Sequence, residues 1–274
     1  MSLTLTILGC GSSGGVPRIG PNWGVCDPDN PKNRRRRASV LIQRQGEGVG
    51  GERGKTNVLV DTSPDIREQL ISAKISLLDA VVYTHDHADH THGIDDLRMA
   101  AFNAKRKIDV YFDQPTRASL TERFSYCFNK RPGSDYPPIL EARDLGIGSP
   151  LHIDGKGGAI EILPLDQEHG NIRSIGLRVG DVAYCSDVSG FPPRTLHELQ
   201  GLDVLIIGAL RYIPHPAHFT VRQALTWIER IRPKRAILTH LHIDLDYESL
   251  KKELPDHVVP AYDGMTVDIV SPSA

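Results

Sequence analysis

Short runs of β-branched and other apolar residues recur along the chain, and most of them are bounded by Gly, Pro or Asp. Runs of this length are typical of strands that are buried on one or both faces. We therefore predict strands at 4–9, 38–43, 57–61, 80–84, 108–112, 159–165, 174–180, 181–187, 203–209, 235–240 and 266–270. The pair 174–180 and 181–187 predicts a hairpin that turns at Gly180 and Asp181.

Some stretches between these runs carry apolar residues at a spacing near 3.6, which predicts helices. They are residues 63–73, 114–128 and 220–231. In the last of them, one face carries Val221, Leu225, Ile228 and Ile231. Ser63 is the expected N-cap of the first helix, with Pro64 in its first turn. A β-rich first third followed by alternating strands and helices predicts an α/β (α+β) fold.

The chain shows no internal repeat and no linker between two halves, so we predict one domain over residues 1–274. Its one long Gly-rich polar stretch, at 45–56, falls between two predicted strands. A stretch of this composition predicts a mobile loop inserted between paired strands.

Composition excludes several function classes. The net charge is −2, so no overall field draws the chain to nucleic acid or to a membrane surface. The longest apolar run, 204–210, is far shorter than the roughly 20 residues of a membrane span. The first residues lack the basic region of a signal peptide. Four widely spaced cysteines predict reduced thiols and a cytoplasmic protein.

Gly9, Gly11 and Gly14 spell G-x-G-x-x-G after the first predicted strand. A dinucleotide site requires a helix directly after this motif, because the helix N-terminus holds the pyrophosphate. Four prolines follow within 17 residues of Gly14, beginning with Pro17 and Pro21, and they interrupt any helix. The motif therefore predicts a loop rather than a nucleotide fold.

The most informative stretch is YTHDHADHTHG, residues 83–93, which follows an apolar strand. His85, His87, Asp89 and His90 form H-x-H-x-D-H within it. Imidazole and carboxylate ligands suit zinc, manganese or iron. Alternate residues of an extended segment point the same way, so His85 and His87 suit one ion, and Asp89 and His90 are turned toward a second position.

Further ligand-type residues follow at strand ends, in the order His169, Asp187 and His240, and Asp61 ends an earlier strand. This series resembles the metallo-β-lactamase-fold hydrolases across nearly the whole chain. The resemblance implies a four-layer αββα sandwich, with two mixed sheets face to face and helices outside. It also implies two divalent ions, zinc or manganese.

The resemblance assigns the ligands in two sets that share a bridging residue. One ion would be held by His85, His87 and His169, the other by Asp89, His90 and His240, with Asp187 bridging both. Asp61 would orient a ligand, although it also suits a helix cap before Ser63 and Pro64. Redox members of the fold carry glutamate where this chain has His87, so the histidine favours hydrolysis.

Four segments are similar to the phosphodiesterase branch that contains the phosphoribosyl cyclic phosphate phosphodiesterase and is related to ribonuclease Z. They are LGCGSSGGVPRIG, HPAHFTVRQAL, LTHLHIDLDY and YDGM. The resemblance implies catalytic roles for Asp89 and for His218, the latter as an imidazolium that protonates the leaving group. His215 would share that role or shape the pocket. His242 would lie behind a ligand, touch substrate or sit on the surface.

The start of the chain adds candidates for substrate contact and one departure from the branch. Ser12, Ser13 and Arg18 are expected to line the pocket. The basic run 34–37 suits either a solvated loop or a phosphate contact. The branch holds a structural zinc through clustered cysteines and a histidine, where this chain has only Cys26 and, at the histidine position, Ile243. We expect no zinc there.

These residues predict a phosphodiesterase that uses a hydroxide held between two metals to hydrolyse a small nucleotide-like or cyclic phosphate. Three alternatives stay open: a thioester or lactone hydrolase of the same fold, an RNA 3′-end processing nuclease, and a non-catalytic metal-binding domain. The resemblance also allows a homodimer. A nucleic-acid substrate is not favoured, because the chain lacks a long basic arm.

Overall fold

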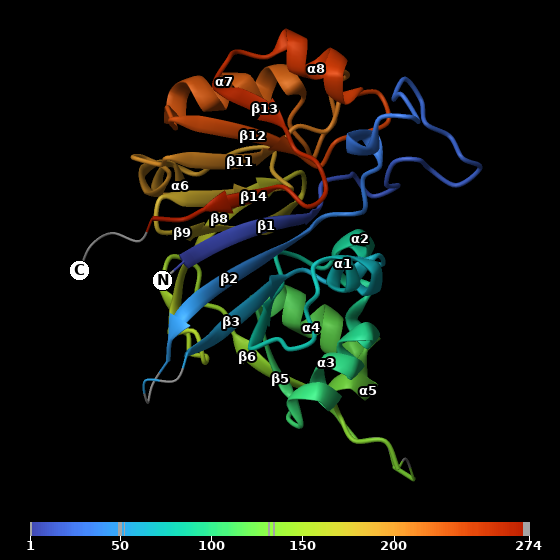
Figure 1. Cartoon of the computed structure of the whole chain (residues 1–274), viewed down its shortest axis with the longest axis vertical. Helices are drawn as coiled ribbons and strands as arrows, with labels where there is room; N and C mark the ends of the chain where they lie inside the picture. Colours follow the sequence, from blue (N-terminus) through green and yellow to red (C-terminus); the bar gives the residue numbers. More distant parts are fainter. Residues whose placement is uncertain (1, 49–50, 52, 131, 134, 271–274) are drawn as a thin grey trace.

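A computed structural model describes residues 2–48, 51, 53–130, 132–133 and 135–270. Within them the strands form two sheets of seven (Figure 1). The first sheet has the order β14 (Thr266–Asp268), β1 (Ser2–Gly9), β2 (Ser39–Glu47), β3 (Arg53–Val60), β4 (Ala80–Val82), β5 (Ile108–Phe112), β6 (Leu140–Asp144). The second has the order β13 (Val258–Pro260), β12 (Arg235–Thr239), β11 (Val204–Gly208), β10 (Val182–Cys185), β9 (Ile172–Val179), β8 (Ile160–His169), β7 (Leu151–Ile153).

Both sheets are mixed, as predicted. The first is antiparallel from β14 to β3 and parallel from β3 to β6. The second is antiparallel from β7 to β10 and parallel from β10 to β13. The predicted hairpin is present, because Val179 pairs with Val182 across a turn in which Gly180 has a φ of 56°. Glycine adopts that backbone conformation without strain.

The apolar runs are buried on both faces, which explains why they show little alternation. In β2, Val40 and Ile42 face the space between the two sheets, whereas Leu41 faces the helices of the first sheet. In β11, Ile206 faces the other sheet and Leu205 faces the helices of its own sheet. The period of two along each strand therefore divides one apolar run between two layers.

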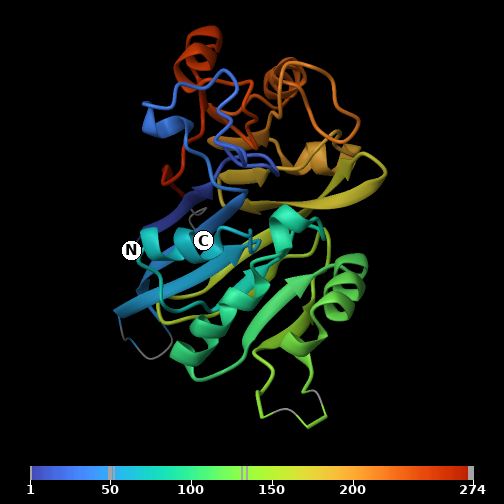
Figure 2. The same ribbon diagram turned by 90° about the vertical axis from the view of Figure 1, so that its right-hand side faces the viewer.

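Helices cover the outer face of each sheet (Figure 2). Those on the first sheet are α1 (Ile66–Ser72), α3 (Leu97–Ala104), α4 (Gln114–Arg123) and α5 (Ser125–Phe128). Those on the second are α6 (Pro193–Glu198), α7 (Val221–Ile231) and α8 (Tyr247–Glu253). Short turns of helix at η1 (Pro31–Asn33), α2 (Ala88–Thr91) and η2 (Ile94–Asp96) complete the elements. The predicted four-layer αββα sandwich is confirmed.

The helix predictions hold in type but not always in their ends. Helix α7 begins at Val221, one residue after the predicted start, and Thr220 is its N-cap in a capping box. Leu225 of the predicted apolar face is only half-buried, whereas the neighbouring Ala224 is fully buried. The stretch 114–128 divides into α4 and α5 at Phe124. Ser63 is not an N-cap, because α1 begins at Ile66; the Ser63 hydroxyl instead donates to Gln69.

The loop predicted at 45–56 is mostly strand. Strands β2 and β3 stay paired from Val40 and Val60 out to Glu47 and Arg53. Residues 49, 50 and 52 lie outside the described residues, so the predicted mobility stays a prediction. The glycines here serve close packing: a Cβ on Gly54 would lie 2.5 Å from the Cβ of Lys156. Sequence composition alone does not distinguish such packing from a loop.

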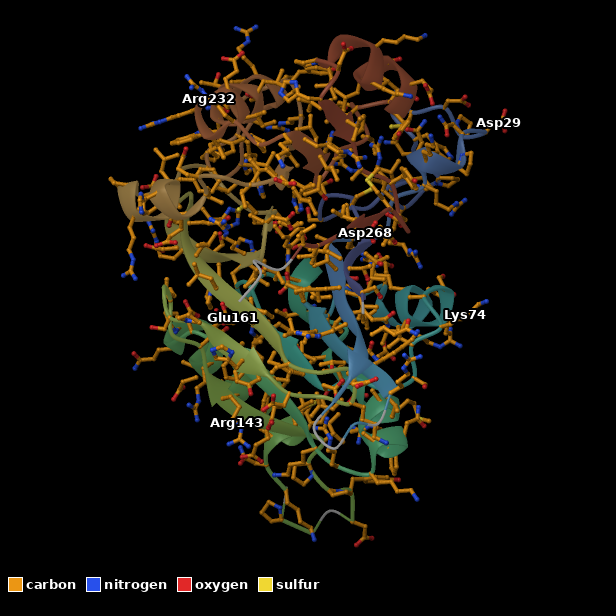
Figure 3. The ribbon with its side chains drawn as sticks, turned by 60° about the vertical axis from the view of Figure 1, so that its left-hand side comes forward. Asp29, Lys74, Arg143, Glu161, Arg232 and Asp268 are labelled. Carbon is orange, nitrogen blue, oxygen red and sulfur yellow. The ribbon has the colours of Figure 1, made fainter. Side chains whose placement is uncertain are left out.

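Several short elements were not predicted from the sequence. They are the strands β6, β7 and β13 and the helices α2, α3, α6 and α8. Charged side chains such as Arg143 on β6 and Asp268 on β14 are exposed along the edge strands of the first sheet (Figure 3). Charges of this kind hinder edge-to-edge pairing with other chains. Of the helices in the described part of the chain, none has the length and apolar character needed to cross a membrane.

Candidate metal centre

The ligand-type residues gather at one edge of the sandwich because several strands end there. From the first sheet, Asp61 follows β3 and the loop with His85 follows β4. From the second sheet, His169 ends β8, Asp187 follows β10 and His240 follows β12. These residues are far apart in sequence but close in space, because both sheets place these strand ends at the same edge.

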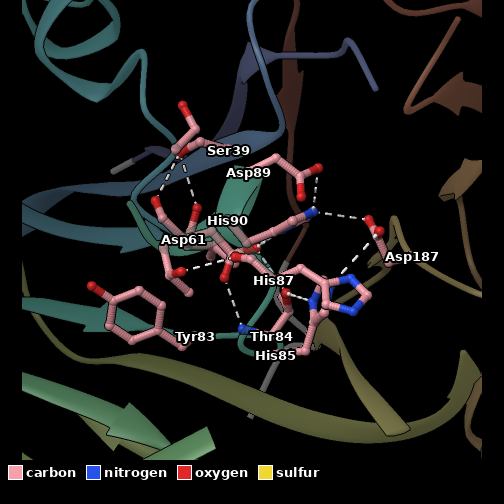
Figure 4. Close-up of polar contacts among 12 residues, drawn as sticks. Ser39, Asp61, Tyr83, Thr84, His85, His87, Asp89, His90 and Asp187 are labelled. Carbon is pink, nitrogen blue, oxygen red and sulfur yellow. Dashed lines mark hydrogen bonds and ion pairs between the residues drawn. The ribbon is translucent and has the colours of Figure 1, made fainter. Parts of the chain in front are cut away.

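A single turn of helix arranges the H-x-H-x-D-H loop. His87 is the N-cap of α2, and its carbonyl accepts a hydrogen bond from the His90 backbone N–H at 3.1 Å. His85 and His87 precede the turn, whereas Asp89 and His90 lie within it (Figure 4). The predicted division of the loop into two pairs therefore comes from a strand end followed by a helical turn, rather than from one extended segment.

The structure brings all seven expected metal ligands together. Ligand atoms of each group lie within 4.8 Å of one another in three overlapping groups: His85, His87, His169 and Asp187; Asp89, His90 and His240; and Asp187, His218 and His240. The first two groups match the two expected ligand sets, and Asp187 also belongs to the third, which includes His240. His87 is exposed and Asp89 half-buried, so the cluster opens to solvent on that side.

The donor atoms fit a metal centre, because several inward-facing polar atoms are buried and make no hydrogen bond within the described residues. They are His85 Nε2, His90 Nε2, Asp187 Oδ1 and His240 Nδ1. Buried polar atoms without partners are costly in a protein interior. Divalent cations held by the two ligand groups would satisfy all four.

The outer nitrogens of three histidines are hydrogen-bonded, which turns the inner nitrogens toward the cluster, where His169 Nε2 lies 3.2 Å from His87 Nδ1. His90 Nδ1 lies 2.6 Å from Asp61 Oδ2, and His85 Nδ1 lies 3.0 Å from the Thr84 hydroxyl oxygen. His169 Nδ1 donates to the Ala217 carbonyl at 2.7 Å. Such outer contacts fix the ring orientation of metal-binding histidines.

Burial and the carboxylates control the charges of these rings. Burial, aided by the nearby His90, holds the pKa of His85 well below its usual value. Burial also lowers the pKa of His87 and of His240. Burial also acts to lower the pKa of His90, but the nearby carboxylates outweigh burial and raise this pKa well above its usual value. These carboxylates are Asp187, Asp89 and Asp61. Neutral imidazoles, as at His85 and His240, are the form that binds metals.

Asp61 organises the loop from behind. Its carboxylate accepts hydrogen bonds from the Thr84 backbone N–H and hydroxyl, both at 2.8 Å, besides its contact with His90. It does not cap α1, whose N-cap position is Asp65. The Ser39 hydroxyl donates to the Asp61 carbonyl and fixes the backbone on the other side (Figure 4).

Sequence reasoning missed Thr84, Ser39 and the Ala217 carbonyl. Thr84 directly precedes His85, so a hydroxyl next to the histidine loop was a readable signal. The other two are brought in by distant segments: Ser39 opens β2, and Ala217 lies 48 residues from His169.

The two histidines of the 215–218 loop occupy different positions. The His218 ring stacks on that of His240, with centroids 4.8 Å apart, and its Nε2 lies 3.8 Å from Asp187 Oδ2. The His215 ring lies 5.0 Å from that of His218, and its Nδ1 accepts from the Ala217 backbone N–H. His218 therefore borders the metal-ligand cluster and His215 lies behind it.

The expected substrate-contact residues belong to the first loop, residues 10–33 after β1. Of these, Ser12 contacts the residue that follows His240. Ser12 donates its backbone N–H to the Leu241 carbonyl at 3.2 Å, and its buried hydroxyl makes no hydrogen bond within the described residues. The Arg18 guanidinium contacts His242 Nε2, and His242 Nδ1 lies 2.9 Å from Asp244. Ser13 is exposed.

The basic run 34–37 is not a uniform solvated loop. Arg35 is buried and donates to the His242 carbonyl and to Asn33. Arg36 pairs with Asp263, and Arg37 pairs with Asp65. Only Arg34 is exposed. The run therefore mainly joins the first loop to the start of α1, through Asp65, and to the segment before β14, through Asp263.

The first glycines also serve packing. A Cβ on Gly9 would lie 2.0 Å from the Arg37 carbonyl oxygen, and one on Gly11 would lie 2.9 Å from that of Arg35. The first loop contains only η1 before β2 begins, so no α-helix follows the G-x-G-x-x-G motif. The predicted loop after the motif is confirmed, and the helix that a dinucleotide site requires does not follow it.

Comparison with known proteins agrees with this fold and site. A family model described as the beta-lactamase superfamily domain matches residues 56–241, which include every ligand-type residue of the cluster. The chain belongs to this superfamily, as its resemblance predicted.

Individual relatives point to the same branch. The structure of a new diphosphatase from the PhnP family is 33% identical, with a TM-score of 0.83 and 98% of each chain covered. The short form of human tRNase Z is 19% identical, with a TM-score of 0.62 over 97% of this chain and 99% of that one, and shows a shared fold. An octanoyltransferase of Porphyromonas gingivalis is 34% identical over 264 residues, which are 94% of this chain. This chain spans only 50% of that relative.

Proposed function

We propose that this protein is a phosphodiesterase-type hydrolase whose ligand cluster holds two divalent ions, zinc or manganese. The observation that carries the proposal is the presence of two ligand groups from different strands, with Asp187 next to both. His85, His87 and His169 would hold one ion, Asp89, His90 and His240 the other, and Asp187 would bridge them. Bound divalent ions activate water and neutralise charge on phosphoryl oxygens.

His218 is the proposed proton-transfer residue. Its ring begins the reaction neutral in this proposal, whereas the sequence predicted an imidazolium. Burial lowers its pKa to about 3, against the opposing effect of Asp187, so the ring is neutral at pH 7. A neutral ring first takes a proton from the attacking water and then passes it to the leaving oxygen. Asp89, half-buried at the open side of the cluster, is proposed to hold the second ion where substrate enters.

The proposed substrate is a small phosphorylated, nucleotide-like compound or a cyclic phosphate. The similarity to a diphosphatase, at 33% identity over nearly the whole chain, supports phosphoryl chemistry and extends it to phosphoric anhydrides. The octanoyltransferase name belongs to a protein twice as long as the matched region, so acyl transfer is not proposed here.

A substrate panel with metal analysis tests this function. We expect hydrolysis of bis(p-nitrophenyl) phosphate, ribose cyclic phosphates or nucleoside diphosphates, and none of S-lactoylglutathione, lactones or 3′-extended tRNA. His87→Ala should lose metal and activity together. His218→Ala should retain metal and lose about 10²–10⁴ in turnover. His152→Ala, at an exposed histidine on β7, is the matched control. Full activity in metal-free His87→Ala protein would overturn the proposal.

A cytoplasmic location belongs to the same proposal. The four cysteines are buried and form no disulfide, which is the usual state of thiols in a reducing compartment. The homodimer that the resemblance allows stays a prediction.

A further inference from the structure

A basic cleft adjoins the ligand cluster. Its volume is about 1000 Å³, and it lies between the first loop, the 34–37 run and α1. Five arginines and three carboxylates line it, together with the backbone of residues 13–17. In Figures 1 and 2 the first loop, drawn in blue, lies on the same side of the molecule as α1 and α2.

Two accessible arginines of the cleft carry charge that no carboxylate neutralises, and a third arginine without a carboxylate partner among the described residues, Arg35, is buried. Arg36 and Arg37 are ion-paired, whereas Arg18 and Arg34 have no carboxylate oxygen within 4.0 Å among the described residues. The Arg18 guanidinium contacts His242 Nε2. Arg34 is exposed, with its guanidinium carbon 5.4 Å from the centre of the Trp23 ring. Neither guanidinium is therefore held by a carboxylate.

The backbone adds neutral donors. Residues 12–15 form a turn in which the Gly15 N–H donates to the Ser12 carbonyl at 2.8 Å. The N–H groups of Ser13 and Gly14 have no acceptor within the described residues, and both residues line the cleft. Consecutive free N–H groups in a turn form a concave site for anions. A Cβ on Gly14 would lie 3.0 Å from Arg18 Nε, so glycine leaves room for that guanidinium.

The cleft meets the cluster on the side of the second ligand group. Ser12 donates its N–H to Leu241, the residue after His240. On the other wall, the hydrogen bonds that Arg37 donates to Asp65 raise the pKa of Arg37, and the negative charge of Asp89 adds to this effect. The first loop and Arg37 thus connect the cleft to the side of the cluster that carries His240 and Asp89, the ligands proposed for the second ion.

We propose that this cleft is a second anion site, in which Arg18, Arg34 and the N–H groups of Ser13 and Gly14 hold a phosphate next to the one hydrolysed. This inference rests on the proposed function and names its substrate class: compounds with two adjacent phosphates, such as nucleoside diphosphates. The phosphates of an RNA chain have related chemistry, but among the described residues that line the cleft only Arg18 and Arg34 are accessible cations without a carboxylate partner.

The test compares a substrate with one phosphate to a substrate with two. In Arg18→Gln/Arg34→Gln protein, the ratio of kcat/KM for ADP to that for bis(p-nitrophenyl) phosphate should fall at least tenfold, mainly through KM, because charge-assisted hydrogen bonds are lost. Arg53→Gln, at an exposed arginine at the far end of β3, should leave the ratio unchanged. Arg34→Gln alone, at an exposed position, should lower the ratio in the same direction if the double variant folds poorly.

Calorimetric binding of ADP to the intact protein separates the two proposals. Weaker ADP binding in the double variant supports the cleft even if neither substrate is hydrolysed, a result that overturns the proposed function alone. An unchanged ratio and unchanged ADP affinity overturn the cleft and leave the proposed function standing. Tighter binding of an oligoribonucleotide than of ADP, lost in the double variant, overturns the small-substrate assignment.

Discussion

Asp61 is a buried residue that connects three others of the site: Ser39, Thr84 and His90. Its backbone has a φ of 61°, and its side chain contacts Thr84 and His90. The sequence allowed two roles, orientation of a ligand or a helix cap. The choice between them depended on where His90 lies, 29 residues further along the chain.

Asp61→Asn should weaken metal binding by about 10- to 100-fold, because an amide holds the His90 ring less strongly than a carboxylate does. Asparagine tolerates the left-handed backbone, so the fold should remain. Titration against a chelator of known affinity measures the effect. Asp95→Asn, at an exposed carboxylate in η2, is the control. Equal metal affinity in both variants would show that Asp61 has no orienting role.

At the scale of elements, α8 depends on a residue that also anchors the first loop. The Asp246 carboxylate caps α8 through the Ser249 N–H at 2.9 Å. It also accepts from Asn33 at 2.7 Å and from the Asp27 N–H at 3.2 Å. The residue that caps α8 therefore also makes contacts to residues more than 200 positions away.

Asp246→Ala should lower the free energy of unfolding by about 1–3 kcal/mol, from the lost cap and the lost bonds to the first loop. Urea unfolding monitored by circular dichroism measures this change. Asp256→Ala, at an exposed aspartate after α8, should have little effect.

Asp246 also predicts a pH dependence. Burial alone would raise its pKa, but hydrogen bonds from Ser249, Asn33 and Asp27 lower it to about 2. The folded pKa is thus below the unfolded value of about 3.9, so the stabilisation is present above pH about 4 and is lost as the pH falls toward 2. Asp246→Asn keeps a capping side chain without this titration. Its stability difference from the wild type should therefore shrink between pH 5 and pH 2, and a constant difference would contradict the assignment.

At the scale of the whole molecule, the ligand cluster joins the two sheets. His85, His87, Asp89 and His90 follow a strand of the first sheet, whereas His169, Asp187 and His240 come from the second. Bound ions would therefore stabilise the packing of one half against the other, in addition to the apolar core between the sheets.

Removing the metals with a chelator should lower the melting temperature by several degrees. A ligand present at 100 times its Kd stabilises the folded state by about 2.7 kcal/mol. Calorimetry before and after chelation measures the shift, and added zinc or manganese should restore it. The His87→Ala protein should melt lower from the start and respond less. A melting temperature that does not depend on metal would mean that no ion joins the sheets.

The sequence by itself determined most strands and the set of residues that cluster. Apolar runs form strands wherever both faces are buried, and ligand-type residues at strand ends stay at those ends, because both properties are local. The tertiary structure decided the rest. Gly48 and Gly54 pack against Lys156 where β2 and β3 extend to Glu47 and Arg53. Asp65, the N-cap of α1, pairs with Arg37, and this pair and the one between Arg36 and Asp263 leave Arg18 and Arg34 as the accessible cations of the cleft. Each of these outcomes depends on partners far away in the chain, which no local pattern contains.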